Sequence, residues 1–159
     1  MKDYSLYIQR ANDNSAKGCV ENWNIAVVES CTDIDGGFRD LASREWADED
    51  GEDVYIPASR KLNAYDAKWT LCYKGAASDA FEKLTDFRDW LSSGGLLMIY
   101  DPKTTTGRIG AYLSKFGTPT YWRKGNEEVL KFEVTFRITS PRKGLTATET
   151  DGVVTLAEN

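Results

Sequence analysis

Hydrophobic and polar residues alternate along most of this chain, with the period of two that a β-strand gives to its two faces. The clearest segment is residues 127–141, in which large apolar side chains alternate with charged or hydroxyl side chains. Its apolar positions are Leu130, Phe132, Val134, Phe136 and Ile138. We expect a strand here, with its apolar face in the core and its charged face in water.

Shorter alternating segments recur elsewhere in the chain. They lie at residues 4–9, 23–28, 54–57, 65–73, 96–100, 108–116 and, more weakly, 152–156. Together with the long segment they predict about eight strands. Such alternation favours antiparallel sheets, which pack one face on the core and leave the other in water.

Residues 78–93 follow a helical period instead, with apolar side chains three or four positions apart. Ser78 is a suitable N-cap, and Asp79 then lies in the first turn, where the helix dipole favours an anion. Gly94 and Gly95 provide a C-terminal stop. A single helix among strands has to pack on a sheet or close the end of a barrel. The predicted fold is therefore mainly β (α+β), an antiparallel β-sandwich or barrel-like domain with one flanking α-helix.

Two segments lack a clear period. Residues 29–53 form a long polar connection, and connections of this length are usually functional or mobile. Residues 142–159 hold few apolar side chains, and we expect them to extend from the body unless they pair with a partner. The predicted organisation is one β domain over residues 1–141, followed by this C-terminal extension.

Composition restricts the classes of function. The formal net charge is −5 and the pI is about 4.9, whereas sequence-independent binding of nucleic acid needs a basic surface. No apolar stretch approaches the roughly 20 residues of a membrane-spanning helix, and the N-terminus lacks the pattern of a signal peptide. We therefore expect neither a specific nucleic-acid partner nor a membrane. The 3 cysteines lack metal-ligand spacing and favour free thiols in a reducing cytoplasm, with one disulfide as the alternative.

Candidate catalytic chemistry is sparse. The chain contains no histidine, the residue that most often serves as a general base or a zinc ligand. Catalysis would then depend on paired carboxylates, for which Asp101 at the end of a strand is the candidate. Because Pro102 follows it, we prefer the interpretation that Asp101 begins a hairpin turn. No phosphate-binding motif is present, so we predict no catalytic residue and no cofactor.

Acidic side chains crowd residues 45–53, which form the one candidate cation site. A calcium-binding loop needs carboxylates at alternating positions and a closing glutamate that binds through both oxygens. This segment lacks the full spacing and the closing glutamate. A solvated acidic loop is the preferred interpretation, and we predict no metal ligand.

The aromatic residues allow two further hypotheses. Aromatic side chains on a sheet stack well against sugar rings, and the candidates are Trp23, Trp46, Tyr55, Trp69, Tyr121 and Trp122. Residues 118–128 place the adjacent Tyr121 and Trp122 beside two basic residues. Exposed aromatic residues next to cations are common at protein–protein interfaces, so this segment is also an interface candidate.

The order of these features resembles that of a known family. A long polar loop leads to a strand with an aromatic residue, an amphipathic helix, a short strand with its turn, and a last long strand. The matching positions are Trp90, Leu91, Asp101, Arg108, Ala111, Tyr112 and residues 132–141. Over roughly residues 20–141 the chain is similar to the N-terminal domain of distal tail proteins of long-tailed, non-contractile bacteriophages and prophages.

This resemblance implies a structural protein of the virion tail, assembled in the cytoplasm of the bacterial host. Domains of this family form a ring, typically of about six copies, at the junction between tail tube and baseplate. The implied partners are further copies, tube proteins and tail-tip components. Two positions depart from the family pattern: Glu52 stands where arginine is frequent, and Ser140 precedes Pro141 in place of aspartate. The sequence shows no counterpart of the larger C-terminal domain of many members, so the contacts of that domain are not implied here.

We predict that exposed side chains of the long loop, of residues 118–128 and of the charged face of the last long strand bind these partners. The interface candidates are Phe38, Arg39, Trp46, Tyr121, Trp122, Arg123, Lys124, Lys131, Glu133 and Arg137. Two alternatives stay open at this point. One is a carbohydrate-binding module that uses the aromatic side chains, and the other is a carboxylate-dependent hydrolase.

Overall fold

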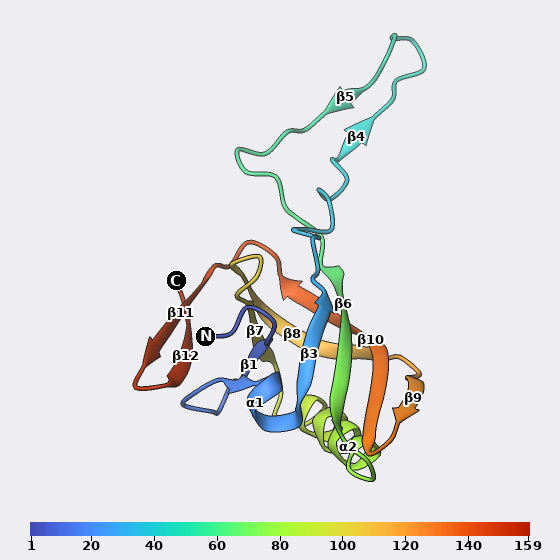
Figure 1. Ribbon diagram of the computed structural model, residues 1–159. Coiled ribbons are helices and arrows are strands. Elements are labelled where there is room, and N and C mark those ends of the chain that lie inside the picture. Colours follow the sequence, from blue (N-terminus) through green and yellow to red (C-terminus); the bar gives the residue numbers. More distant parts are fainter.

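The long strand β10 (Glu127–Ser140) is the centre of the structure, a computed structural model that describes residues 1–159 (Figure 1). Along one edge β10 pairs with β6 (Tyr65–Ala76) over almost its whole length. Along the other edge its N-terminal half pairs with β9 (Thr120–Lys124) and its C-terminal half with β8 (Thr106–Phe116). All of these pairings are antiparallel, as the alternating sequence pattern predicts.

Four further strands complete an 8-stranded sheet with the order β2-β1-β7-β8-β10-β6-β3, in which β9 pairs with β10. Their bounds are Tyr7–Arg10 for β1, Lys17–Gly18 for β2, Ile25–Glu29 for β3 and Leu97–Asp101 for β7. The sheet curls into an antiparallel half-barrel. The predicted mainly β fold with one flanking α-helix is confirmed, in its barrel-like form.

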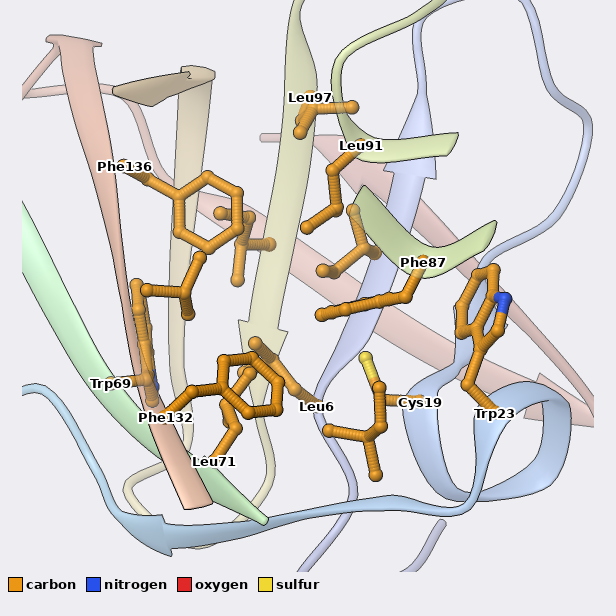
Figure 2. Close-up of a cluster of buried hydrophobic side chains, with 14 of the residues drawn as sticks. Leu6, Cys19, Trp23, Trp69, Leu71, Phe87, Leu91, Leu97, Phe132 and Phe136 are labelled. Carbon is orange, nitrogen blue, oxygen red and sulfur yellow. The ribbon is translucent and has the colours of Figure 1, made fainter. Parts of the chain in front are cut away.

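The helix α2 (Ala80–Leu91) covers the apolar face of the sheet. Its buried side chains include Leu84, Phe87 and Leu91, which lie on one face of the helix. Figure 2 shows Phe87 pointing from α2 into the core, close to Trp23. The ring centroids of these two residues are 5.1 Å apart. The apolar side of the predicted helix is therefore the side that packs on the sheet.

The start of α2 differs from the sequence-based expectation. Asp79 is the N-cap residue, and Ser78 precedes the helix with a φ of 80°. The turn out of β6 causes this, because the amide of Ala77 donates to the carbonyl of Asn126 at 2.6 Å and holds the chain before the helix begins. The expected stop is confirmed, since Gly94 and Gly95 both have a φ of 82°.

A second helix, α1 (Cys19–Trp23), was not expected. Trp23 ends this helix instead of starting a strand, and Asn24 follows in the left-handed conformation, with a φ of 56°. The position of Trp23 has a packing reason, because its ring contacts both Phe87 and Trp90 of α2. Burial of a large aromatic side chain outweighs the weak strand pattern of this segment.

The C-terminal segment also differs from the expectation of an extended tail. The strands β11 (Leu145–Thr150) and β12 (Val153–Glu158) form a hairpin that packs on the body. Val154 and Leu156 are buried against Tyr7 of β1 and form a small second core. The amide of Leu156 also donates to the side-chain oxygen of Gln9 at 2.9 Å. Leu145 and Ala147 of the same hairpin pack beside them, so the apolar side of the hairpin holds this segment on the body.

We expect the substitution Leu156→Ala to lower the free energy of unfolding of this hairpin by about 2 kcal/mol, because it removes a buried side chain from a small cluster. Hydrogen exchange at the amide that bonds Gln9 should become faster, while the amides of β10 keep their protection. The control is Val153→Ala, since Val153 is 51% exposed on the same strand. An equal rate of hydrogen exchange in the two variants would show that the buried side chains do not stabilise the hairpin.

Residues 30–64, here called the arm, project away from the sheet between β3 and β6 (Figure 1). The arm holds only two short paired strands, β4 (Ser43–Arg44) and β5 (Asp53–Val54), and a bridge between Phe38 and Leu62. The loop predicted at residues 29–53 is thus only the first part of the arm, which continues through residue 64 and returns to the sheet. None of the helices is long and apolar enough to cross a membrane.

Candidate protein–protein interface

Arg108 of β8 holds the base of the arm. Its Nη2 donates to the carbonyl oxygens of Cys31, at 3.4 Å, and Asp33, at 2.8 Å, where the chain enters the arm. Its Nε donates to the hydroxyl of Tyr65, at 3.2 Å, where the chain leaves the arm. Burial raises the pKa of this tyrosine hydroxyl, and the adjacent guanidinium lowers it. One buried cation therefore binds both ends of the arm.

The same arginine is connected to the core through Trp69. The Arg108 guanidinium lies 4.9 Å from the centre of the Trp69 ring, and the indole Nε1 donates to Oδ2 of Asp101 at 3.1 Å. The other oxygen of Asp101 accepts the backbone amide of Lys103 at 3.0 Å. The predicted turn after Asp101 is confirmed, and its carboxylate is fully buried within this network. This residue is a structural acid and does not face a cleft.

The arm differs from the body in charge. Residues 30–64 contain nine acidic and four basic side chains, so the arm accounts for the whole net charge of −5 and the remaining residues are neutral. The arm also exposes more large apolar side chains than its length would suggest. They are Ile34, Phe38, Trp46, Val54, Tyr55 and Ile56. Clustered exposed apolar residues of this kind mark interaction sites in soluble proteins.

The aromatic candidates of the arm are oriented by neighbouring polar groups. The Arg60 guanidinium lies 4.4 Å from the ring centre of Phe38, and that of Arg44 lies 3.9 Å from the ring centre of Trp46. The indole Nε1 of Trp46 also donates to Asp53 at 2.9 Å. Cation–π contacts of this type hold a side chain in place without covering it. Both aromatic residues, and the neighbouring candidate Arg39, remain exposed.

The polar face of the sheet carries a groove with a volume of about 740 Å³. We call it the lysine groove and define it by Lys68, Lys115, Lys131 and Trp122. These residues come from β6, β8, β10 and β9, in that order. Thr135 lies opposite Lys68 on one neighbouring strand and opposite Lys115 on the other, which sets the two lysines in one row across three strands.

Two glutamates lie in the next row of the groove. Glu133 is paired in register with Thr70, and Thr70 is paired with Glu29 of β3. The Thr70 hydroxyl donates to the Glu29 carboxylate at 3.3 Å. Lys131 lies two residues before Glu133 on β10, on the same face of the strand. Rows that carry lysine and rows that carry glutamate therefore alternate along the groove. This pattern of charge suits a ligand that carries both signs.

The remaining candidates lie around this groove, but not in one patch. Tyr121 points to the opposite face of β9, where it stacks on Phe81 with a centroid distance of 5.8 Å. Arg123 donates to the carbonyl of Gly125, and Lys124 is exposed beside it. Arg137 forms an exposed ion pair with Asp66 at 3.3 Å. The structure therefore groups Trp122, Lys131 and Glu133 in the groove and separates them from the arm candidates.

The six aromatic residues of the carbohydrate hypothesis do not form one exposed platform. Trp23 and Trp69 are buried in the core, and Trp46 and Tyr55 lie in the arm. The acidic segment likewise does not form a metal centre, since no group of three or more His, Cys, Asp or Glu side chains is arranged to hold an ion.

Sequence reasoning missed Lys68, Lys115 and Glu29 as groove residues. Lys68 lies at a polar position of an alternating segment, so the pattern could identify it as solvent-facing. Lys115 continues the apolar phase of its segment and faces solvent because the pairing of β8 with β10 shifts register next to it. Glu29 lies just beyond the alternating segment 23–28. The pattern could not place the three side chains together, because that depends on which strands pair and in what register.

Comparison with protein-family models and with curated protein sequences finds no match. The architecture described above, a curled antiparallel half-barrel with one covering helix, is nevertheless found among solved structures. It is similar to the crystal structure of Dit from bacteriophage SPP1, described as a paradigm of the hub of the adsorption apparatus in phages that infect Gram-positive bacteria.

The match to Dit has a TM-score of 0.54 and a sequence identity of 13%, and it covers 90% of this chain. It covers 54% of the Dit chain, so the present chain spans about half the length of that protein. The sequence motifs indicated a resemblance to distal tail proteins, and the structure confirms it as a likeness of fold.

Proposed function

We propose that this chain is a structural component of a phage tail, which assembles into a ring at the junction between tail tube and baseplate and binds neighbouring tail proteins. The observation that carries this proposal is the fold shared with Dit, a hub protein of the phage adsorption apparatus. The resemblance of the sequence motifs to distal tail proteins points the same way. We place the protein in the virion tail, after assembly in the host cytoplasm.

The shape of the molecule supports self-association. A ring needs a heterologous interface, in which one surface of each copy binds a different surface of the next. The arm and the polar face of the sheet are two such surfaces, and neither is covered by the chain that carries it. The buried clamp at Arg108 fixes the base of the arm, which lowers the entropy lost when the arm binds.

The polar surfaces favour binding over catalysis. The groove is lined by lysine, threonine and glutamate side chains with one exposed tryptophan, and the carboxylate of Asp101 lies in the core. The fold is also shared with Dit, a hub protein of the phage adsorption apparatus. We therefore propose a structural role for the chain, with no enzymatic activity.

Light scattering on purified protein tests self-association. We expect a particle of about six times the chain mass of 17.8 kDa, and a ring in electron micrographs. Replacing residues 35–62 by a short Gly-Ser linker should give a folded monomer. The linker can close the gap because Gly36 lies against the backbone of Ala64 at the base of the arm. A native chain that stays monomeric at every concentration would contradict the ring.

Antibody labelling of intact virions tests the location. We expect gold particles at the distal end of the tail tube, close to the baseplate. The matched control is an antibody against the major tube protein, which should label the whole length of the tail. Label on the capsid, or on host membranes alone, would contradict a role at this junction.

A further inference from the structure

We propose that the acidic tip of the arm, residues 45–53, docks in the lysine groove of the next copy. This inference rests on the self-association proposed above and names the two surfaces that meet. The tip contains six acidic side chains, and none of them forms an ion pair within the chain. The arm therefore presents a concentrated negative charge that its own chain leaves unbalanced.

The groove offers the opposite charge. Lys68, Lys115 and Lys131 also form no ion pair within the chain. Neighbouring strands lie about 5 Å apart and alternate residues on a strand about 7 Å apart, so these three strands bring the lysines within reach of one short segment. Charges of opposite sign on two surfaces steer their encounter and fix their register.

The two glutamates of the groove, Glu29 and Glu133, make the arm a better ligand for the groove than a simple anion. A phosphate group or a nucleic-acid backbone would meet like charges at Glu133 and Glu29, in the row next to the lysines. The arm brings Arg44 directly before its acidic tip, and this guanidinium can pair with a glutamate while the acids pair with the lysines. The arm thus carries both signs of charge, as the groove does.

Apolar contacts reinforce this pairing. Trp122 lines the groove with 51% of its surface exposed, and Tyr55 and Ile56 of the arm are 71% and 67% exposed directly after the tip. Exposed aromatic residues beside cations are typical of the centre of protein interfaces. Docking of the tip in the groove would bring these apolar side chains close to one another.

The direction of the arm favours a second copy as the occupant of the groove. The arm points away from the sheet of its own chain (Figure 1). Its base is held by Arg108, through Tyr65 and the carbonyl of Asp33. A tip held in this direction meets a neighbouring molecule before it can fold back on its own groove. The contact is head-to-tail, which is the geometry that closes rings.

Charge reversal tests the contact. The groove variant carries Lys68→Glu, Lys115→Glu and Lys131→Glu, and the arm variant carries Asp48→Lys, Glu49→Lys and Asp50→Lys. We expect each variant to raise the apparent dissociation constant of the ring by at least about 100-fold. In the groove variant like charges face each other, and in the arm variant the tip keeps three acidic side chains beside three lysines and loses its net negative charge. Combining all six substitutions in one chain should restore assembly. A mixture of the two variants should also assemble, since the acidic tip of the groove variant then finds the native lysines of the arm variant, and the three new lysines of the arm variant find the glutamates of the groove variant.

The matched control reverses three basic residues elsewhere on the surface, with Lys83→Glu, Lys103→Glu and Lys143→Glu. Lys143 pairs with Glu158, but the pair is exposed and contributes little to stability. It changes the net charge by the same amount as the groove variant, and we expect it to assemble like the native chain. Thermal unfolding of every variant should give one cooperative transition near that of the native protein, since all of the changed groove and tip residues are exposed.

A cross-link gives a second, independent readout. Cys72 is half-buried on β6 and lies opposite Lys131, so it marks the groove. Introducing Glu49→Cys and treating the ring with a bismaleimide should join neighbouring copies into covalent dimers. The same variant with Cys72→Ser should give no such dimer. Burial raises the pKa of the Cys72 thiol, so the reaction should be run at mildly alkaline pH.

The outcomes separate the two proposals. If the native chain forms rings and both reversed variants form them equally well, docking of the tip in the groove is wrong and self-association stands. If the native chain stays monomeric and gives no cross-link, both proposals fail. Loss of assembly in each variant, with recovery in the combined chain and in the mixture, supports docking at this groove.

Discussion

Replacing Phe87 by alanine is expected to lower the free energy of unfolding by about 4 kcal/mol. Phe87 is fully buried at the centre of the core, where its ring lies 5.1 Å from that of Trp23 and 6.4 Å from that of Phe132. The substitution removes contacts to α1, to the sheet and to Phe116 at once. The remaining side chains are held by hydrogen-bonded strands and cannot move far enough to fill the cavity. Urea titration measures the loss.

Phe81→Ala is the matched control for this substitution. Phe81 lies on the same helix but is 55% exposed, and Tyr121 is its one stacking partner. We expect a loss below about 1 kcal/mol for an exposed position of this kind. A similar midpoint and slope of the urea unfolding transition for the two variants would show that the buried face of α2 does not stabilise the sheet.

Replacing Arg108 by methionine is expected to lower the free energy of unfolding by about 3 kcal/mol, because buried partners lose a charged donor. The variant leaves the Tyr65 hydroxyl without that donor and frees the carbonyl oxygens at the start of the arm. The base of the arm should become the first site of proteolytic cleavage. Limited proteolysis with mass spectrometry locates the cut, and urea titration measures the loss.

The control for this prediction is Arg88→Met. Arg88 is exposed on α2 and pairs with the adjacent Asp89, a contact that adds little to stability. We expect unchanged stability and an unchanged pattern of cleavage. If Arg108→Met were cut first in the C-terminal hairpin and not at the arm, the clamp at the arm base would be disproved.

The alternation of residue types predicted the long strands of the sheet and the face that each one buries. The expected strand at residues 54–57 is wrong, because only Asp53–Val54 pair there and both are exposed in the arm. The short strands β2 and β4 and the strand β11 were not predicted. The residues on either side of Phe132 are charged and must face water, so the side chain of Phe132 has to point to the opposite face of the strand, into the core. The same argument identified Lys131 and Glu133 as solvent-facing. The local sequence pattern gave a wrong prediction where the path of the chain mattered more than the helix-capping preference of a residue. Ser78 is a good N-cap by type, but the turn out of β6 places it in a left-handed conformation before the helix begins.

The arrangement of the groove lay beyond the reach of sequence reasoning. Its lysines are separated by tens of residues and meet only because β6, β8 and β10 are neighbours in the sheet. The pair Tyr121 and Trp122 shows the converse. The two residues were predicted to act together because they are adjacent in sequence, yet adjacent residues of a strand point to opposite faces. Only Trp122 reaches the groove.

The central place of β10 has a consequence for translation. This strand is the last of the large sheet to leave the ribosome, yet β6, β8 and β9 all depend on it for pairing. At a synthesis rate of roughly 5–20 residues per second, one edge of β6 stays unpaired for seconds, although β3 can already pair with the other. The unpaired backbone groups of this edge are exposed to other nascent chains during this time. Host chaperones that shield such edges should therefore improve the yield of native protein.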